Sequence, residues 1–169
     1  MTARAENHPD DRASAPARGA GADGEWVLVV TSKRMKAWGW GLAAAAIVIH
    51  LFMGAVVGVG DTGAAVTPID VVAYPLIGVI VAACALLLTR PRVRVNENGV
   101  EVRNFLGPRF YVWADIYGLS FPEDAVCARL ELPDFEFVPM WAMPASDGER
   151  TVDAVTRFRE LEDRWMPED

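Results

Sequence analysis

The chain has 169 residues and a formal net charge of −7, and its length suits one modest domain together with a membrane segment. The acidic charge is concentrated in residues 95–169, which contain seven Arg, no Lys and sixteen Asp or Glu. Affinity for nucleic acids comes largely from basic side chains that neutralise phosphates. This balance therefore excludes DNA and RNA as expected ligands.

The first 25 residues are rich in Ala, Gly, Asp, Arg and Pro and show no apolar periodicity. This composition is typical of disorder, and we interpret residues 1–25 as a solvated tail. Trp26-Val-Leu-Val-Val30 then forms a short apolar run. The run is either a strand that joins the C-terminal domain or a segment in the membrane interface, and the sequence leaves both alternatives open.

Two apolar segments, 37–59 and 68–89, contain no Asp, Glu, Lys or Arg apart from Asp70. A helix needs about 20 apolar residues to cross a bilayer, and a Lys or Arg at mid-membrane costs roughly 2.5–3.5 kcal/mol. Buried helices of a soluble protein are the alternative, but such helices rarely stay apolar on every face. We predict a membrane module over 26–89, built on a two-helix transmembrane hairpin.

Basic residues flank the hairpin on one side only. They are Lys33, Arg34, Lys36, Arg90, Arg92 and Arg94. The connecting loop, 60–69, contains Asp61 but no Lys or Arg. Cytoplasmic flanks collect Lys and Arg, so we expect a multi-pass protein of the cell membrane, surrounded by membrane lipids, with both termini in the cytoplasm.

Small residues in both segments indicate close helix packing. Gly54 and Gly58 form a GxxxG pattern, which lets another backbone approach closely. We expect them to pack on Gly78 and Ala82 within one chain, and a homodimer through the same pattern is the alternative. His50 lies near mid-span, where we predict a neutral imidazole hydrogen-bonded across the hairpin, because no carboxylate in either span core completes a proton relay.

After Pro91 the apolar residues recur with a period of two, which is typical of strands. Asn98-Gly99 separates two such runs and is a hairpin signal, because both positions tolerate positive φ. A turn at Leu106-Gly-Pro108 precedes a predicted strand that we expect to place three side chains on one face: Phe110, Val112 and Ala114. Further strands are predicted at 117–121, 129–132 and 135–143. Short strands in succession favour an antiparallel barrel or sandwich.

The chain ends in a predicted amphipathic helix of roughly 18 residues. Ser146-Asp-Gly-Glu149 has the spacing of a capping box at its start. The apolar stripe is predicted to contain Val152, Val155, Phe158, Leu161 or Glu162, and Trp165. We expect this stripe to close the open end of the barrel.

Four stretches resemble a known family: Arg90-Pro-Arg-Val-Arg-Val95, Asn98-Gly-Val-Glu-Val102, Val112-Trp-Ala-Asp-Ile116 and Asp147-Gly-Glu-Arg150. They are similar to the bacterial PH-like family of actinobacterial membrane proteins, which includes those called low-molecular-weight protein antigen 6. The resemblance implies a transmembrane hairpin plus a small cytoplasmic α+β domain over 90–169, a PH-like antiparallel β-barrel capped by a C-terminal α-helix. It also implies that Trp113 and Ile116 are buried around an acidic turn, and it implies no catalytic residues.

No constellation of residues predicts catalysis, a cofactor or a metal site. The two histidines, His8 and His50, lie in the tail and in the hairpin, so the C-terminal domain has no His for a metal site or a Ser/His/Asp arrangement. The chain also lacks a Gly-rich phosphate loop. Cys84 and Cys127 are expected to be inert apolar residues.

Two sets of residues are candidates for binding. The candidate contacts for a protein partner are Met140, Trp141 and Met143, although core packing is favoured for any one of them. The candidate lipid-facing residues are Arg92, Arg94, Arg103 and Arg109. We predict a membrane-anchored, non-enzymatic interaction module that binds an unidentified protein partner, and lipid head-group sensing near the membrane is the alternative.

Overall fold

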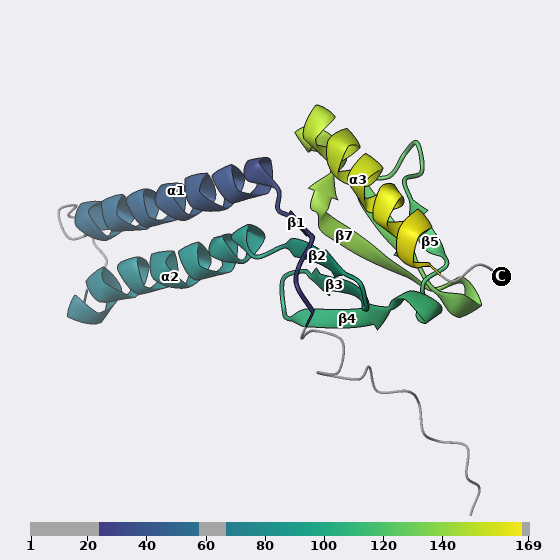
Figure 1. Ribbon diagram of the computed structural model, residues 1–169. Helices are drawn as coiled ribbons and strands as arrows, with labels where there is room; N and C mark the ends of the chain where they lie inside the picture. Colours follow the sequence, from purple (N-terminus) through teal and green to yellow (C-terminus); the bar gives the residue numbers. More distant parts are fainter. Residues whose placement is uncertain (1–23, 58–66, 167–169) are drawn as a thin grey trace, which may run out of the picture.

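The computed structural model describes residues 24–57 and 67–166. A hairpin of two long helices projects from a domain in which two antiparallel sheets and a third helix enclose the core (Figure 1). In chain order the helices and strands are β1 (Leu28–Val30), α1 (Lys33–Val57), α2 (Pro68–Leu86), β2 (Arg92–Asn96), β3 (Gly99–Arg103), β4 (Pro108–Val112), β5 (Gly118–Ser120), β6 (Cys127–Glu131), β7 (Phe137–Pro144) and α3 (Glu149–Trp165). Short 3-10 turns lie at η1 (Leu87–Thr89), η2 (Trp113–Asp115), η3 (Pro133–Phe135) and η4 (Ala145–Asp147). Most of the tail predicted over 1–25 lies outside the described residues.

Helices α1 and α2 are both long and apolar enough to cross a membrane. They meet along small side chains, where Ala43, Ala46 and Ala82 form a buried cluster. Large apolar residues on their other faces, including Trp38 and Phe52, are exposed. The helix pair is therefore apolar on every side, whereas a surface helix of a soluble protein has one polar face.

The glycines of the hairpin pack within the chain, but not in the predicted pairs. A Cβ on Gly54 would lie 3.2 Å from the Val71 carbonyl oxygen and 3.3 Å from Pro75 Cδ, so Gly54 faces the first half of α2. Gly78 faces His50 instead. The antiparallel arrangement explains the difference, because residues late in α1 meet residues early in α2. Gly58 lies outside the described residues, and the homodimer stays a prediction.

The predicted hydrogen bond from His50 across the hairpin is wrong. Its Nδ1 atom lies 2.7 Å from the carbonyl oxygen of Ala46, one turn earlier in the same helix. A backbone acceptor four residues back is within reach of a helical side chain without any contribution from the second helix.

The first sheet has the order β1-β2-β3-β4. The strand alternative for the apolar run near Trp26 is confirmed, because β1 pairs antiparallel with β2 at Leu28↔Val95 and Val30↔Val93. The helical hairpin is therefore inserted between two neighbouring strands of one sheet. Residues 28–30 belong to the sheet rather than to the membrane module predicted from residue 26.

The β2–β3 turn is displaced by one residue from its predicted position. Asn96 pairs with Gly99, so Glu97 and Asn98 form the turn. The side-chain oxygen of Asn96 accepts hydrogen bonds from the backbone N–H groups of Asn98 and Gly99, both at 3.0 Å. Asn96 is fully buried. Its two hydrogen bonds stabilise the turn, which therefore does not need a positive φ at Asn98.

The second sheet has the order β5-β6-β7. Among the described strands no ladder joins it to the first sheet, so the PH-like barrel is open rather than closed. Core side chains from both sheets meet between them, including Val93, Leu130 and Met140. The predicted fold class is confirmed in its main features: two apolar helices, seven antiparallel strands and a C-terminal helix.

Helix α3 covers the core, but its start and its buried face differ from the prediction. Its N-cap is Gly148, which makes no side-chain cap bond, so the predicted capping box is wrong: Ser146 lies in η4 instead. Val152 is 64% exposed, whereas Thr151 and Ala154 are buried together with Phe158. The Thr151 hydroxyl donates to the Pro144 carbonyl oxygen at 2.6 Å, which turns this residue toward β7.

The prediction for β4 holds for Phe110 and Val112, which occupy alternate positions of the strand and so share a face. Ala114 lies in η2 rather than in the strand. Tyr111, on the other face of β4, packs against the core. The burial of Trp113 and Ile116 is confirmed, since the η2 turn directs both side chains inward while Asp115 stays in water.

Candidate functional site

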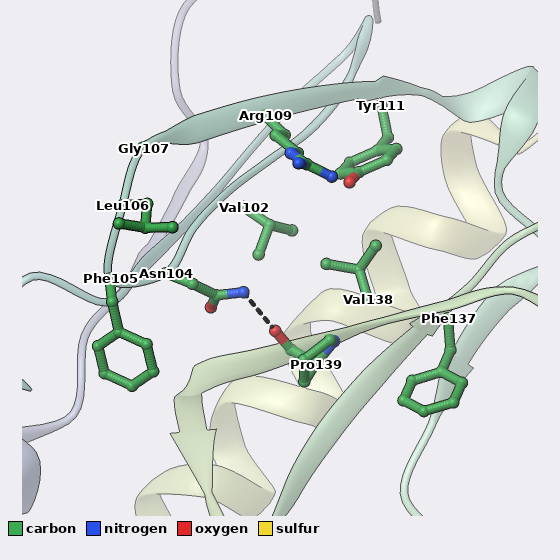
Figure 2. Close-up of a pocket in the computed structure, with 10 residues that line it drawn as sticks. All are labelled: Val102, Asn104, Phe105, Leu106, Gly107, Arg109, Tyr111, Phe137, Val138 and Pro139. Carbon is green, nitrogen blue, oxygen red and sulfur yellow. Dashed lines mark hydrogen bonds between the residues drawn. The ribbon is translucent and has the colours of Figure 1, made fainter. Parts of the chain in front are cut away.

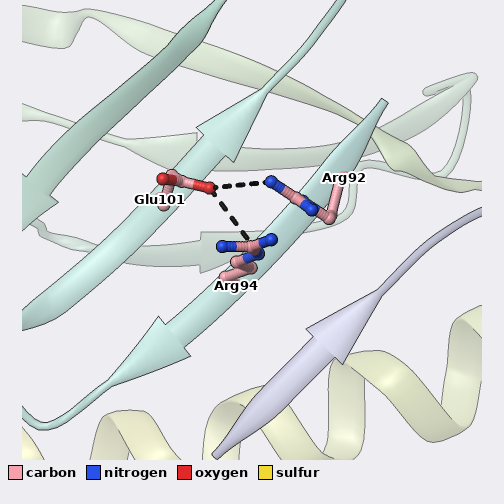
Figure 3. Close-up of polar contacts among 3 residues, drawn as sticks. All are labelled: Arg92, Arg94 and Glu101. Carbon is pink, nitrogen blue, oxygen red and sulfur yellow. Dashed lines mark ion pairs between the residues drawn. The ribbon is translucent and has the colours of Figure 1, made fainter. Parts of the chain in front are cut away.

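Two of the four predicted lipid-facing arginines are held by one carboxylate on the outer face of the first sheet (Figure 3). Glu101 Oε1 lies 3.6 Å from Arg92 Nη2 and 3.8 Å from Arg94 Nε. Burial lowers the pKa of Arg92, as do the positive charges of Arg94 and Arg103, while Glu101 acts in the opposite direction. Glu101 therefore offsets part of the positive charge that the sequence suggested was free.

The other two arginines lie on opposite faces of the sheet. Arg103 pairs with Arg92 and shares its outer face. Arg109 pairs with the buried residue Val102, and directly paired residues share a face. The single basic face that the sequence suggested is therefore wrong, because the turn between β3 and β4 places Arg109 on the other side.

A concave site lies between the end strands of the two sheets, and we call it the seam groove (Figure 2). Its cavity has a volume of about 560 Å³. It is lined by Val102, Asn104, Phe105, Leu106, Gly107, Arg109, Tyr111, Phe137, Val138 and Pro139. Both β4 and β7 are end strands of their sheets, so the groove lies where the barrel is open.

Apolar side chains dominate the rim of the seam groove. Leu106 is 94% exposed and Phe137 is 52% exposed. The guanidinium of Arg129 lies over the Phe137 ring at 4.6 Å, which fixes that ring from one side. Because both apolar side chains stay in water within a concave site, the groove is suited to an apolar ligand surface.

The groove contains few polar groups. Asn104 Nδ2 donates to the Pro139 carbonyl oxygen at 2.9 Å and links the β3–β4 turn to β7 (Figure 2). Asn104 Oδ1 is buried and has no hydrogen-bond partner within the described residues. A buried acceptor without a donor is costly, so this oxygen is available for a donor from a bound molecule.

The predicted protein contacts on β7 divide into core and surface. Met140 and Met143 are 0% exposed and belong to the core, so neither is available to a partner. Trp141 is partly exposed and packs on Phe105, with ring centroids 5.7 Å apart. It therefore supports the turn that carries Leu106.

Sequence reasoning missed Phe105, Leu106 and Phe137. A signal was present in Asn104-Phe-Leu-Gly-Pro108, where two large apolar residues occupy a turn, a place that normally carries polar side chains. Recognising the groove required knowing that this turn lies beside β7, which is a long-range contact.

The side chains with shifted pKa values lie away from the seam groove. No group of three or more His, Cys, Asp or Glu that could hold a metal occurs within the described residues. Burial raises the pKa of the Cys127 thiol, which keeps it protonated in the core. Burial also raises the pKa of Glu162, whose carboxylate accepts the Leu119 N–H at 3.3 Å. Neither side chain lines the seam groove.

Residues 90–161 match the model of the bacterial PH domain. The chain is 34% identical over 147 residues to "Uncharacterized protein Rv1417" of Mycobacterium tuberculosis (strain ATCC 25618 / H37Rv), covering 87% of this chain and 96% of that protein. "Uncharacterized protein Mb1452" of Mycobacterium bovis matches with the same identity and coverage.

The chain therefore belongs to the bacterial PH-domain family. A match of 147 residues within a chain of 169 extends beyond the PH region and includes the helical hairpin. No solved structure matches the chain significantly.

Proposed function

We propose that the protein is a membrane-anchored, non-enzymatic PH-like module that binds a protein partner through the seam groove. The observation that carries this proposal is the exposed apolar rim formed by Leu106 and Phe137. Exposed large apolar side chains at a concave site are typical of interaction surfaces. The lining contains no Cys, His, Asp or Glu, which supports binding rather than catalysis.

An extended peptide that adds a strand to β4 is the mode of binding that fits the groove. β4 has a strand neighbour on one side only, and its other edge offers backbone groups for pairing. The β7 side offers less, because Pro139 has no N–H and its carbonyl is taken by Asn104. Leu106 and Phe137 would hold apolar side chains of the peptide, and Asn104 Oδ1 would accept one N–H.

The membrane anchor follows from the hairpin and its flanks. α1 and α2 have the length and apolarity of spans, and the basic residues near Lys33 and Arg90 support a cytoplasmic location for both termini. The domain contacts the start of the first span, since the Lys33 N–H donates to Asp147 Oδ2 at 3.2 Å. The groove would thereby be presented in a fixed orientation to the cytoplasmic side.

A photoreactive amino acid at position 106 of the full-length chain, in native membranes, tests the proposal. We expect one discrete protein adduct that disappears when Phe137→Ser is also introduced. The matched control is the same photoreactive residue at Phe135, which is fully exposed but outside the groove. The same adduct pattern from both positions, or an adduct that survives Phe137→Ser, contradicts binding through the seam groove.

A further inference from the structure

A second groove lies where the helical hairpin joins the first sheet, and we call it the junction groove. It is lined by Val29, Thr31, Lys36, Thr89, Arg90, Pro91, Arg92 and Arg103, and its cavity has a volume of about 450 Å³. Four of these eight side chains are cationic and none is acidic. The groove thus differs from the domain that carries it, since residues 95–169 contain seven Arg against sixteen Asp and Glu.

The cations reach the groove from four separate segments. Lys36 comes from the first turn of α1, Arg90 from the link after η1, Arg92 from β2 and Arg103 from β3. Lys36, Arg90 and Arg92 belong to the flanks of the hairpin, and charge asymmetry between flanks accounts for them. Arg103 lies in a later strand, so flank composition gives no reason for its presence in the groove.

The charges of the junction groove are left partly uncompensated. Arg92 and Arg103 are directly paired in the β2–β3 ladder, and like charges in such positions are destabilising. Glu101 contacts Arg92 and Arg94 only, so that Lys36, Arg90 and Arg103 form no ion pair within the described residues. The Nε atom of Arg92 is buried and has no hydrogen-bond partner among the residues that the structure describes. An anion in the groove would relieve each of these costs.

We infer that the junction groove binds the phosphate-bearing head group of an anionic phospholipid from the leaflet in which the hairpin ends. The inference rests on the proposal that α1 and α2 cross a membrane, but not on protein binding at the seam groove. Lys36 lies in the same helical segment as Trp38 and Trp40, which are both exposed, and exposed Trp beside Lys is typical of the membrane–water interface. A lipid whose acyl chains lie along the apolar helices therefore carries its phosphate to the level of this groove.

A hydroxyl group of the lining positions one of the cations. Lys36 Nζ lies 3.3 Å from Thr31 Oγ1, to which it donates, and this contact holds the ammonium at the edge of β1. Arginine and lysine side chains are the usual donors to phosphate oxygens. The groove thus recognises its ligand by negative charge and by position at the membrane edge.

Native mass spectrometry of the full-length protein in a mixture of phosphatidylglycerol and phosphatidylcholine with identical acyl chains tests the inference. We expect preferential retention of one phosphatidylglycerol. Arg103→Gln should lower this preference about fivefold, the fold-change that corresponds to ~1 kcal/mol for one cation near an anionic lipid surface. Arg90→Gln should act alike, and because Arg90 is exposed, this variant keeps the test valid if Arg103→Gln fails to fold.

Arg109→Gln is the matched control, since Arg109 lies on the opposite face of the same sheet. It should leave the lipid preference unchanged, as should Leu106→Asp in the seam groove, which separates this inference from the proposed protein binding. Equal retention of both lipids by the native chain overturns the inference. So does an equal loss from Arg109→Gln, or displacement of phosphatidylglycerol by millimolar inorganic phosphate, which would assign the groove to soluble anions.

Discussion

The seam groove and the junction groove use the same sheet and have opposite chemistry. Leu106 and Phe137 give the seam groove an apolar rim, whereas the junction groove contains Lys36 and three arginines. The β3–β4 turn, which lies between Arg103 and Arg109, separates them. Two arginines six positions apart in the sequence therefore serve different surfaces, one that faces the hairpin and one at the open side of the barrel.

This difference shows why a basic count is a poor guide to a binding site in a β domain. Successive side chains of a strand point to opposite faces, so that one residue of register decides which surface a charge joins. The overall acidity of residues 95–169 also says little about the junction groove, because three of its four cations lie outside that range. Function here depends on which residues the fold brings together.

The largest expected effect is the loss of both grooves together when the shared core is damaged. Trp113 is buried, donates from Nε1 to the Asn96 carbonyl oxygen at 3.0 Å, and packs on Phe158 with ring centroids 6.0 Å apart. Trp113→Ala should lower the free energy of unfolding by about 3–5 kcal/mol. Thermal unfolding of the full-length chain in detergent measures it.

The control for this variant is its neighbour. Val112→Ala changes an exposed side chain of β4 and should shift the melting temperature little. Equal shifts for the two variants would mean that the domain core is not built around Trp113.

A smaller effect should separate the two grooves by damaging the hairpin alone. A Cβ on Gly78 would lie 2.7 Å from His50 Cβ, so Gly78→Leu forces the helices apart and should cost about 1–3 kcal/mol. Because the junction groove takes Lys36 from α1 and Thr89 from the end of the hairpin, lipid preference should fall while adducts at position 106 persist.

Gly41→Leu is the matched control, since a Cβ there meets nothing within 4 Å. It should leave both the stability of the hairpin and the lipid preference unchanged. If Gly78→Leu behaves like Gly41→Leu, the two helices do not pack in the described register.

The smallest expected effect is a pH dependence that belongs to the core and to neither groove. Burial raises the pKa of Glu162 above its ordinary value of 4.5, so the native state holds this proton at higher pH than the unfolded chain does. Stability contributed by this group therefore falls as pH rises from the unfolded value through the raised folded value.

Glu162→Gln should remove that slope, because the amide oxygen still accepts the Leu119 N–H and no longer titrates. Chemical denaturation between pH 4 and pH 8 measures the slope in both chains. An unchanged slope in the variant would show that Glu162 does not ionise differently in the native and unfolded states.

Features with a local cause could be predicted from the sequence. The apolar runs 37–59 and 68–89 identify the helices α1 and α2, because spanning helices depend on composition alone. The inward position of Trp113 and Ile116 follows from a family pattern in one short turn. The succession of short strands after Pro91 is predicted from turn signals and a period of two alone.

Features set by long-range contacts could not be predicted. The buried face of α3 includes Thr151 because its hydroxyl finds the Pro144 carbonyl, and nothing in the helix itself indicates that partner. The separation of Arg103 from Arg109 depends on how the β3–β4 turn sets the register. Both grooves combine residues from distant segments, so periodicity within any single segment does not reveal them.

The central claim is that a membrane hairpin holds the PH-like domain at the cytoplasmic face, and thiol labelling in intact cells tests it most directly. Thr62→Cys and Ser146→Cys are compared with the parent chain, whose Cys127 is buried and whose Cys84 lies in α2. We predict that a membrane-impermeant reagent labels Thr62→Cys, and labels Ser146→Cys only after the cells are lysed. Labelling of Ser146→Cys but not Thr62→Cys in intact cells would contradict the account.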